Sequence, residues 1–482
     1  MAVGGATIRA AKASRKPNLL VLLPDELRAD VVAGEAAHTL HAPNIHNLVS
    51  ESVVFERTYV THPICAPARS SILSGNWPHQ TGCTRNEKAL PRDFLCLPQM
   101  LADSDYKTGY FGKWHLGDEA FPQRGFQEWA STEEYAKSAG RGKKHAPKSD
   151  YTKFLLSKGY QPQPDKGQTF GRPFVSTLPF ELSKPRFLEL KANDFLERHR
   201  NEPFVLFVAF YEPHPPYNGP FNDEHPLDSI ALDPTAAEIF GEDIPLRYRL
   251  LQEHFRKQMR SDSAYRETKQ KYLGLITEID YSVGAILAKL DELGLRENTI
   301  TVLTSDHGDM MSSHGLLEKI VMFEQSARVP LLIRMPGEKP NRCPQLISQI
   351  DFAPTMLDLL GKPPHAQCAG RSRAGLVRGE TAAPEFVFMQ WSPSKEPIHN
   401  RSKLASPEEI DRVLDESTRA VVSPDGWKLC LRDKDKNELY NLRDDPDERS
   451  NLYYQQGHRD VIVDLTDRIH RWQQSTGDKL VI

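Results

Sequence analysis

The chain reads NLLVLLPDE from Asn18 to Glu26, an unbroken apolar run that ends in two carboxylic acids. A run without polar alternation is typical of a strand buried on both faces, as in a parallel sheet covered by helices. Downstream, TITVLTSDHGD from Thr299 to Asp309 repeats this pattern and delivers Asp306 and His307. Because ligands in open α/β sheets gather at the carboxyl ends of the strands, we expect both polar ends to meet at one site.

The rest of the chain predicts a large α/β domain and a smaller one. Apolar residues spaced by three and four from Tyr272 to Leu290 predict one buried helix face. We assign residues 1–370 to a catalytic α/β domain and 371–482 to a smaller C-terminal subdomain. In the latter, short strand-like runs followed by a helix from about Asp460 to Gln473 predict an antiparallel sheet with a helix.

The composition argues against several classes of binding partner. With 61 basic and 65 acidic residues the net charge is −4, which gives no general attraction to nucleic acid or to an anionic membrane. No stretch reaches the roughly 20 apolar residues of a membrane span. The segment from Met1 to Lys16 is basic and lacks an apolar signal core, so we expect a cytoplasmic protein, unless a signal was trimmed from a periplasmic or secreted one. The oligomeric state stays open.

A third segment, CAPARSSILSG from Cys65 to Gly75, carries a thiol. Taken alone, this Cys-x-Pro-x-Arg pattern could equally be a buried structural cysteine before a helix. Each acidic strand end, taken alone, is explained by a helix cap or a turn. A helix beginning near Ser70 would place Arg69 one turn along the same face as Cys65. The positive end of that helix would then lie at the thiol.

This segment resembles the signature of the sulfatase family, with Cys, Pro and Arg at the family's relative positions; Ala68 and Ser74 stand where the family more often has Ser and Thr. The resemblance implies that a formylglycine-generating enzyme oxidises Cys65 to Cα-formylglycine, whose hydrated aldehyde, a geminal diol, attacks the sulfur of a sulfate ester. It implies that Arg69 hydrogen-bonds the diol oxygens. It also implies an alkaline-phosphatase-like sandwich around a mostly parallel sheet, with a small C-terminal domain built on an antiparallel sheet and a helix.

The resemblance further implies a divalent metal site at the two strand ends, formed by Asp25, Glu26, Cys65, Asp306 and His307. The family commonly has Asp-Asp at the first strand end, so Glu26 departs from the pattern. Oxygen donors suit a hard cation such as Mg²⁺ or Ca²⁺, and His307 also admits Mn²⁺ or Zn²⁺. Calcium is the cation that the resemblance implies.

Basic residues stand where the family keeps its sulfate-binding groups. GKWHLG, residues 112–117, puts Lys113 and His115 on one side of an extended segment. By resemblance Lys113 binds the sulfate and His115 contacts a hydroxyl of the formylglycine diol. Lone basic residues are more often solvated or packed, but these follow the family's order. By resemblance His214 binds the sulfate or protonates the leaving alcohol, Lys319 faces the bridging oxygen, and Asn86 contacts the sulfate.

Three functions are open at this point. The first is hydrolysis of sulfate esters, with a sulfated carbohydrate or another sulfated small molecule as substrate. A phosphonate monoester or phosphodiester hydrolase shares the Cys-x-Pro-Ala-Arg run, although the Gly-Lys-Trp-His context resembles sulfatases. A non-catalytic sulfated-glycan-binding protein would require lost catalytic residues, and we find none lost. Residues 131–173 and 215–261 lack a core pattern, follow active-site motifs and are expected to form the substrate pocket.

Overall fold

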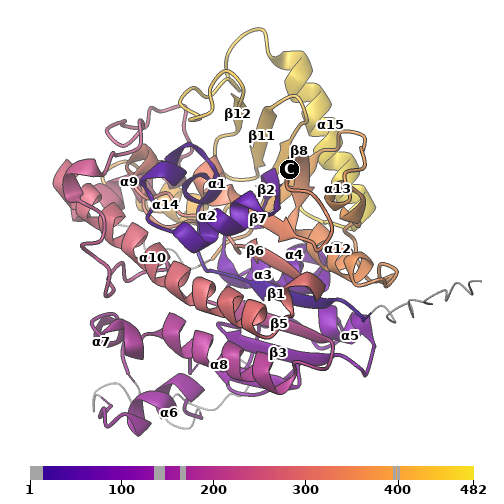
Figure 1. Ribbon diagram of the computed structural model, residues 1–482. Helices are drawn as coiled ribbons and strands as arrows, with labels where there is room; N and C mark the ends of the chain where they lie inside the picture. Colours follow the sequence, from indigo (N-terminus) through magenta and orange to yellow (C-terminus); the bar gives the residue numbers. More distant parts are fainter. Residues whose placement is uncertain (1–14, 135–146, 163–169, 395–397, 399–401) are drawn as a thin grey trace, which may run out of the picture.

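The computed structural model describes residues 15–134, 147–162, 170–394, 398 and 402–482, and its larger sheet has eight strands (Figure 1). The basic N-terminal segment, apart from its last residues, and part of the expected pocket segment 131–173 lie outside these residues. In spatial order the strands are β4 (Glu128–Ser131), β3 (Lys107–Gly112), β5 (Phe204–Ala209), β1 (Asn18–Leu22), β6 (Thr299–Thr304), β7 (Arg328–Arg334), β2 (Val53–Tyr59) and β8 (Asn341–Ser348).

The predicted parallel sheet is confirmed, and the two acidic strand ends are neighbours in it. β1 pairs in parallel with β5 on one side and with β6 on the other. β7 runs antiparallel to β6 and β2, so the sheet is mostly rather than entirely parallel. Because β1, β5 and β6 point the same way, the segments that follow them leave the sheet at one edge.

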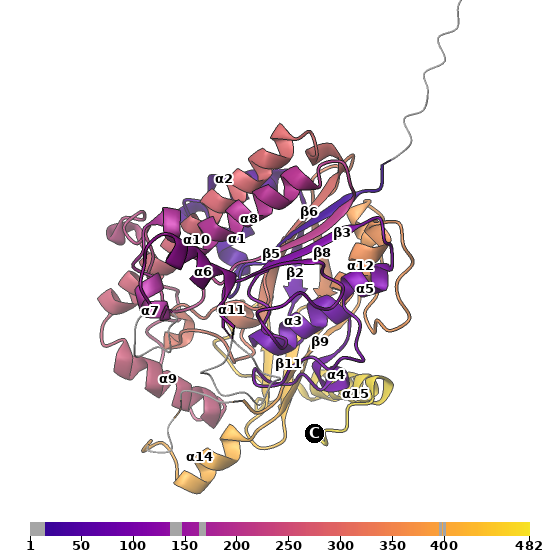
Figure 2. The ribbon, with the colours of Figure 1, turned by 90° about the horizontal axis from the view of Figure 1, so that it is seen from below.

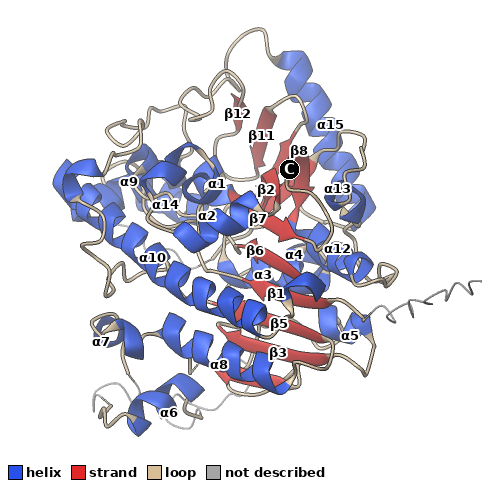
Figure 3. Ribbon diagram, in the orientation of Figure 1, coloured by secondary structure: helices blue, strands red, loops and turns tan. Residues whose placement is uncertain are grey.

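Helices cover both faces of this sheet, which is the predicted sandwich (Figures 2 and 3). Alternate residues of β1 enter opposite cores: Leu20 lies in one apolar cluster, and Leu19 and Val21 lie in the other. The first face carries α1 (Ala29–Ala33), α2 (Pro43–Ser50), α6 (Asp150–Ser157), α8 (Lys184–Arg198) and α10 (Asp262–Glu292), and the second carries α3 (Cys65–Ser74), α5 (Leu97–Leu101) and α12 (Phe352–Leu359). The stripe from Tyr272 to Leu290 is the buried face of α10, as predicted.

The C-terminal region forms the predicted antiparallel sheet with its helix. Its four strands, in spatial order, are β12 (Glu438–Asn441), β11 (Trp427–Arg432), β10 (Thr418–Val422) and β9 (Val387–Trp391), and α15 (Arg459–Thr476) packs on them. The remaining α-helices of the described residues are α4 (Pro78–Thr81), α7 (Arg172–Val175), α9 (Leu246–Gln258), α11 (Glu324–Ala327), α13 (Ala374–Val377) and α14 (Pro407–Leu414). The predicted division after residue 370 stays a prediction.

Buried charges join the two sheets. The Lys428 ammonium of β11 lies 3.1 Å from Glu324 Oε1 and 2.8 Å from Glu448 Oε1, and Tyr59 donates a hydrogen bond to Glu324 Oε2 at 2.9 Å. We call these four residues the interface cluster. Tyr59 lies in β2 of the larger sheet and Lys428 in β11 of the C-terminal sheet, while Glu324 begins α11 and Glu448 lies in the loop after β12. The cluster therefore connects the C-terminal sheet to the large domain.

All six cysteines lie within the described residues and are free thiols. Across the described ranges, no helix combines the length and the apolarity needed to cross a membrane.

Candidate active site

The two acidic strand ends meet, as the sequence predicted. Asp25 and Glu26 follow β1, and Asp306 follows β6, its parallel neighbour. Glu26 has a left-handed backbone with φ 72°, which non-glycine residues rarely adopt. Its N–H donates to Asp306 Oδ1 at 3.2 Å, and its carbonyl accepts from Tyr272 at 2.9 Å. These bonds hold the two strand ends together.

Four of the predicted residues gather around one buried point. Cys65 Sγ lies 3.1 Å from His307 Nε2 and 3.9 Å from Asp25 Oδ1. His307 Nε2 in turn lies 3.6 Å from Asp25 Oδ1 and 3.9 Å from Asp306 Oδ1. One potential ligand atom from each of these residues lies within 4.8 Å of the others, and all four residues are buried. This set, which we call the four-residue cluster, could hold a metal ion.

Cys65 is the first residue of α3, and this helix begins earlier than expected. The sequence predicted a helix starting near Ser70, whereas α3 begins at Cys65 itself, and all ten of its residues are buried. Arg69, one turn later, donates from Nε to Asp306 Oδ2 at 2.7 Å and from Nη1 to the Lys113 carbonyl at 2.7 Å. The helix therefore joins the thiol to the strand end that supplies Asp306.

Lys113 is a second cation beside the four-residue cluster, in addition to Arg69. Its ammonium contacts the Asp25 carboxylate directly and lies 3.5 Å from Cys65 Sγ. It follows β3, another parallel strand that ends at the same edge. Burial lowers the pKa of Lys113, but the charges of Asp25 and Cys65 outweigh this effect and raise it above its ordinary value. The residue therefore stays positive at neutral pH.

Glu26 is not part of the four-residue cluster and contacts two other predicted residues. Its Oε2 accepts a hydrogen bond from Lys319 Nζ at 2.7 Å and lies 3.7 Å from His214 Nε2. Burial lowers the pKa of His214 well below its ordinary value, and the positive charge of Lys319 lowers it further. The imidazole is therefore neutral at neutral pH. Glu26, Lys319 and His214 form a second row beside the four-residue cluster.

Opposite charges in and beside the four-residue cluster stabilise the ionised forms of Asp306 and His307. Burial raises the pKa of Asp306, yet the positive charges of Arg69 and His307 hold it well below its ordinary value. Burial lowers the pKa of His307, whereas the charges of Asp306 and Cys65 raise it to about 10. Such perturbation in a group of convergent side chains is typical of functional sites.

Two further predicted residues, Asn86 and His115, have contacts outside the four-residue cluster. Asn86 Oδ1 accepts a hydrogen bond from the Ala66 N–H at 3.0 Å, in the first turn of α3. His115 is not in the extended segment that was expected: its φ is 61°, and its N–H donates to Glu119 Oε1 at 2.7 Å. The buried Glu119 thus shapes the turn after Lys113. The proposed roles of Asn86 and His115 stay predictions.

Sequence reasoning missed residues that support these side chains. The Tyr211 hydroxyl lies 2.9 Å from His214 Nδ1 and orients the imidazole ring. The only signal for Tyr211 in the sequence is that it directly follows the apolar run from Phe204 to Phe210. Gln349 donates to the carbonyls of Ser305 and Asp306 at 3.1 and 2.7 Å. No feature of the sequence around Gln349 indicated this contact.

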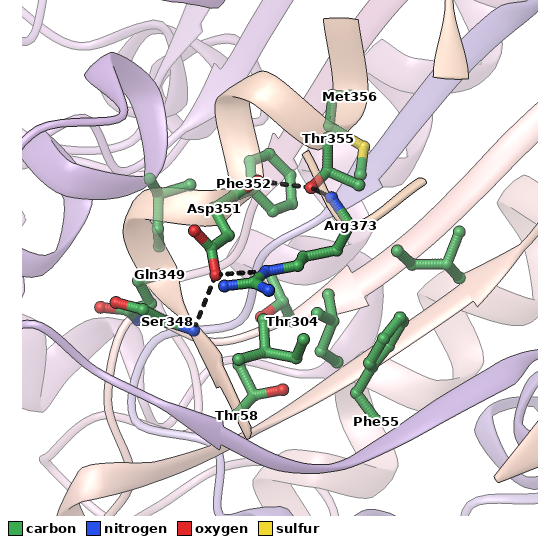
Figure 4. Close-up of a pocket in the computed structure, with 14 residues that line it drawn as sticks. Phe55, Thr58, Thr304, Ser348, Gln349, Asp351, Phe352, Thr355, Met356 and Arg373 are labelled. Atoms are coloured by element: carbon green, nitrogen blue, oxygen red, sulfur yellow. Dashed lines mark hydrogen bonds and ion pairs between the residues drawn. The ribbon is translucent and has the colours of Figure 1, made fainter. Parts of the chain in front are cut away.

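A small apolar cavity lies elsewhere, between β2, β7 and α12 (Figure 4). Three of its polar lining residues bond one another: Arg373 Nε donates to Asp351 Oδ2 at 2.9 Å, and the same oxygen accepts from the Ser348 N–H at 3.3 Å. None of the predicted site residues lines it. We interpret this cavity as a packing defect of the core rather than as a binding site.

Comparisons with known proteins agree with this geometry. The family model "Sulfatase" matches residues 17–362. An ulvan-active sulfatase of Formosa agariphila is 28% identical over 71% of this chain, which spans 61% of that relative's length. An N-acetylglucosamine-6-O-sulfatase of Bacteroides thetaiotaomicron is 24% identical over 91% of this chain and 83% of its own.

A solved structure supports the fold. The phosphonate monoester hydrolase SpPMH from Silicibacter pomeroyi superposes with a TM-score of 0.79 over 96% of both chains at 21% identity. Identity at this level speaks for the architecture alone. The family model covers most of the chain, including both acidic strand ends and the Cys65 segment. The chain therefore belongs to the sulfatase family, whose members are sulfuric ester hydrolases.

Proposed function

We propose that this protein hydrolyses sulfate esters of sulfated carbohydrates and releases inorganic sulfate. The observation that carries the proposal is the convergence of Asp25, Cys65, Asp306 and His307 on one buried point, beside the ammonium of Lys113. The carbohydrate part is supported by the names of the two relatives, which specify ulvan and N-acetylglucosamine 6-O-sulfate.

The donor set fits a divalent cation and a modified cysteine. Two carboxylates and an imidazole, with an oxygen in place of the Cys65 sulfur, suit Ca²⁺, Mg²⁺ or Mn²⁺. When bound, the cation supplies charge neutralisation, and formylglycine at position 65 supplies the hydrated aldehyde that attacks sulfur. Glu26 is still a predicted ligand, although its carboxylate is engaged by Lys319 at 2.7 Å.

The remaining residues hold charge and move protons around the sulfate. Lys113 and Lys319 place two ammonium groups where a sulfate would add negative charge, which stabilises both binding and the transition state. Arg69 fixes Asp306 and balances its charge through the 2.7 Å contact. His214 is oriented through Nδ1 and is neutral in the free protein. The negative charge of a sulfate bound at the lysines would favour its protonated form, from which Nε2 can give a proton to the leaving alcohol.

Parallel assays with an aryl sulfate and an aryl phosphonate monoester test the proposal. The phosphonate alternative is kept because SpPMH shares the fold over 96% of both chains. We expect the sulfate ester to have the higher kcat/KM, and a preference for the phosphonate would reverse the assignment. Protein made with a formylglycine-generating enzyme should show a Cys65 peptide about 18 Da lighter, or its hydrate. Active protein that holds only unmodified cysteine would contradict the mechanism.

A further inference from the structure

A second cavity, with polar and charged residues in its lining, lies directly beside His214. Its walls come from α7, the start of α8, the loop after β5 and the middle of α10. The charged and aromatic side chains that line it are Arg172, Lys184, Tyr211, Glu212, His214 and Glu278. Because His214 both lines this cavity and faces Glu26 and Lys319, a substrate whose sulfate lies at the lysines can place its alcohol half here.

Arg172 is held one aromatic ring away from His214. Its guanidinium carbon lies 4.6 Å from the ring centroid of Tyr211, and the Tyr211 hydroxyl is bonded to His214 Nδ1 at 2.9 Å. Arg172 Nη2 donates to Glu133 Oε2 at 3.1 Å, while Lys184 Nζ donates to Glu133 Oε1 at 2.5 Å. The arginine is therefore fixed in position by a stacked ring and by a shared carboxylate.

This corner of the cavity has more positive than negative charge. Burial raises the pKa of Glu133, but Lys184 and Arg172 lower it to about 2, so one carboxylate faces two cations. Glu212 and Glu278 also line the cavity; burial raises the pKa of Glu212 to about 7 and that of Glu278 well above its ordinary value, so these two carboxyls offset only part of the surplus. The surplus favours a negatively charged ligand.

Arg172 also keeps hydrogen-bonding capacity for a ligand. Among the described residues, its guanidinium donates to Glu133 alone, although a guanidinium has five N–H groups. Its side chain is 45% exposed, whereas that of Lys184 is 5% exposed. Of the two cations, Arg172 is thus the one that can reach a bound molecule.

We propose that Arg172 is a specificity residue that binds an anionic oxygen group, a carboxylate or a second sulfate, on the alcohol half of the substrate. The inference rests on the proposed sulfate-ester hydrolysis and narrows its substrate class to sulfate esters with a second negative charge. A planar guanidinium suits such groups because it can donate two parallel hydrogen bonds to them.

The test compares kcat/KM for three matched sugar sulfates: a neutral monosulfate, the same sugar with a uronic carboxylate, and the same sugar with a second sulfate. Arg172→Met keeps an apolar stem against Tyr211 but removes the charge, and Arg172→Lys restores a cation. Arg186→Met is the control, because Arg186 is a partly exposed arginine of α8 that pairs with Glu189 and does not line the cavity.

We expect Arg172→Met to lower kcat/KM about 10- to 100-fold for at least one doubly charged substrate and less than about threefold for the neutral one. The substrate with the larger loss shows whether Arg172 binds the carboxylate or the second sulfate. Arg172→Lys should recover part of the lost kcat/KM. Equal losses for all three sugars, or no loss for any, would overturn the inference, because Arg172 would then act only as support for Tyr211 or not at all.

A binding measurement separates this inference from the proposed function. Calorimetry with the Cys65→Ala protein gives dissociation constants for the same three sugars without turnover. Adding Arg172→Met should weaken binding of a doubly charged sugar about tenfold or more. Absence of wild-type turnover of every sulfate ester would refute the proposed function, whereas equal affinities with and without Arg172 would refute the inference.

Discussion

The protein contains two buried clusters of charge that look alike chemically and differ in position. The four-residue cluster and the cations beside it lie where β1 and β6 end. In the interface cluster Lys428 bonds Glu324 and Glu448 between the two sheets. Burial lowers the pKa of Lys428, but Glu448 and Glu324 raise it well above its ordinary value, just as acids raise that of Lys113.

The difference teaches that perturbed ionisation alone does not identify a catalytic site. The interface cluster encloses one ammonium between two carboxylates that come from sequence-distant segments. The four-residue cluster instead surrounds a thiol at the carboxyl edge of a parallel sheet, where ligands of such folds bind. We therefore expect mutations in the two clusters to separate activity from stability.

Cys65→Ala should have the largest effect on activity. The substitution removes the source of the nucleophile, so turnover should fall by at least about four orders of magnitude. The cavity left by one sulfur atom is small, and the unfolding midpoint should stay close to that of the wild type. Hydrolysis of an aryl sulfate and a thermal melt measure both. Retained activity would refute the proposed mechanism.

Lys428→Met should do the opposite. It leaves Glu324 and Glu448 buried without their cation, which costs about 3–5 kcal/mol in the free energy of unfolding when one partner of a buried pair is removed. The kcat of the remaining folded protein should not change. Urea denaturation measures the loss, with Lys434→Met as control, since Lys434 forms an exposed pair with Asp415. An unchanged midpoint would show that the cluster does not hold the sheets together.

Asp306→Asn should weaken metal binding and lower kcat about 100-fold or more, because it removes one anionic ligand atom and the partner of Arg69. Glu26→Gln should do less, since Glu26 lies beside Lys319 rather than in the four-residue cluster. Metal content by elemental analysis and turnover at saturating substrate give the comparison. Full occupancy and normal kcat in Asp306→Asn would remove this strand end from the active site.

Tyr211→Phe should lower kcat about tenfold with little change in KM. The substitution keeps the ring against Arg172 and removes the hydrogen bond that orients His214. Because a misoriented His214 would transfer its proton less efficiently, the pH dependence of kcat should change as well. Tyr281→Phe, on the exposed side of α10, serves as control. A pH profile identical to that of the wild type would argue against a positioning role.

Acid should loosen the C-terminal helix by a smaller amount. Burial raises the pKa of Asp478, but the hydrogen bond from Arg419 lowers it from 3.8 to about 2. A carboxyl with a depressed pKa in the folded state stabilises the protein above about pH 4, and this stability is lost as the pH falls toward 2. Urea midpoints at pH 5 and pH 3 should therefore differ more for the wild type than for Asp478→Asn. Equal differences would contradict this assignment.

Much of the fold and of the site could be predicted because their signals are local. The buried strands before Asp25 and Asp306 are continuous apolar runs, and the helix stripe of α10 has a clear period. The partners of Glu26 could not be predicted, because its contact with Lys319 depends on the directions of two side chains that are 293 residues apart in the sequence. The left-handed backbone of His115 was equally hidden, since the acid that holds it, Glu119, carries no motif.

The burial of α3 has a consequence for the order of events during biosynthesis. Cys65 is 1% exposed in the folded protein, and the whole helix that it begins is enclosed. An enzyme that oxidises this thiol must bring its own catalytic groups within bonding distance, which the closed fold prevents. Conversion of Cys65 would therefore have to precede completion of the fold, and a chain that folds first would be locked in an unmodified form.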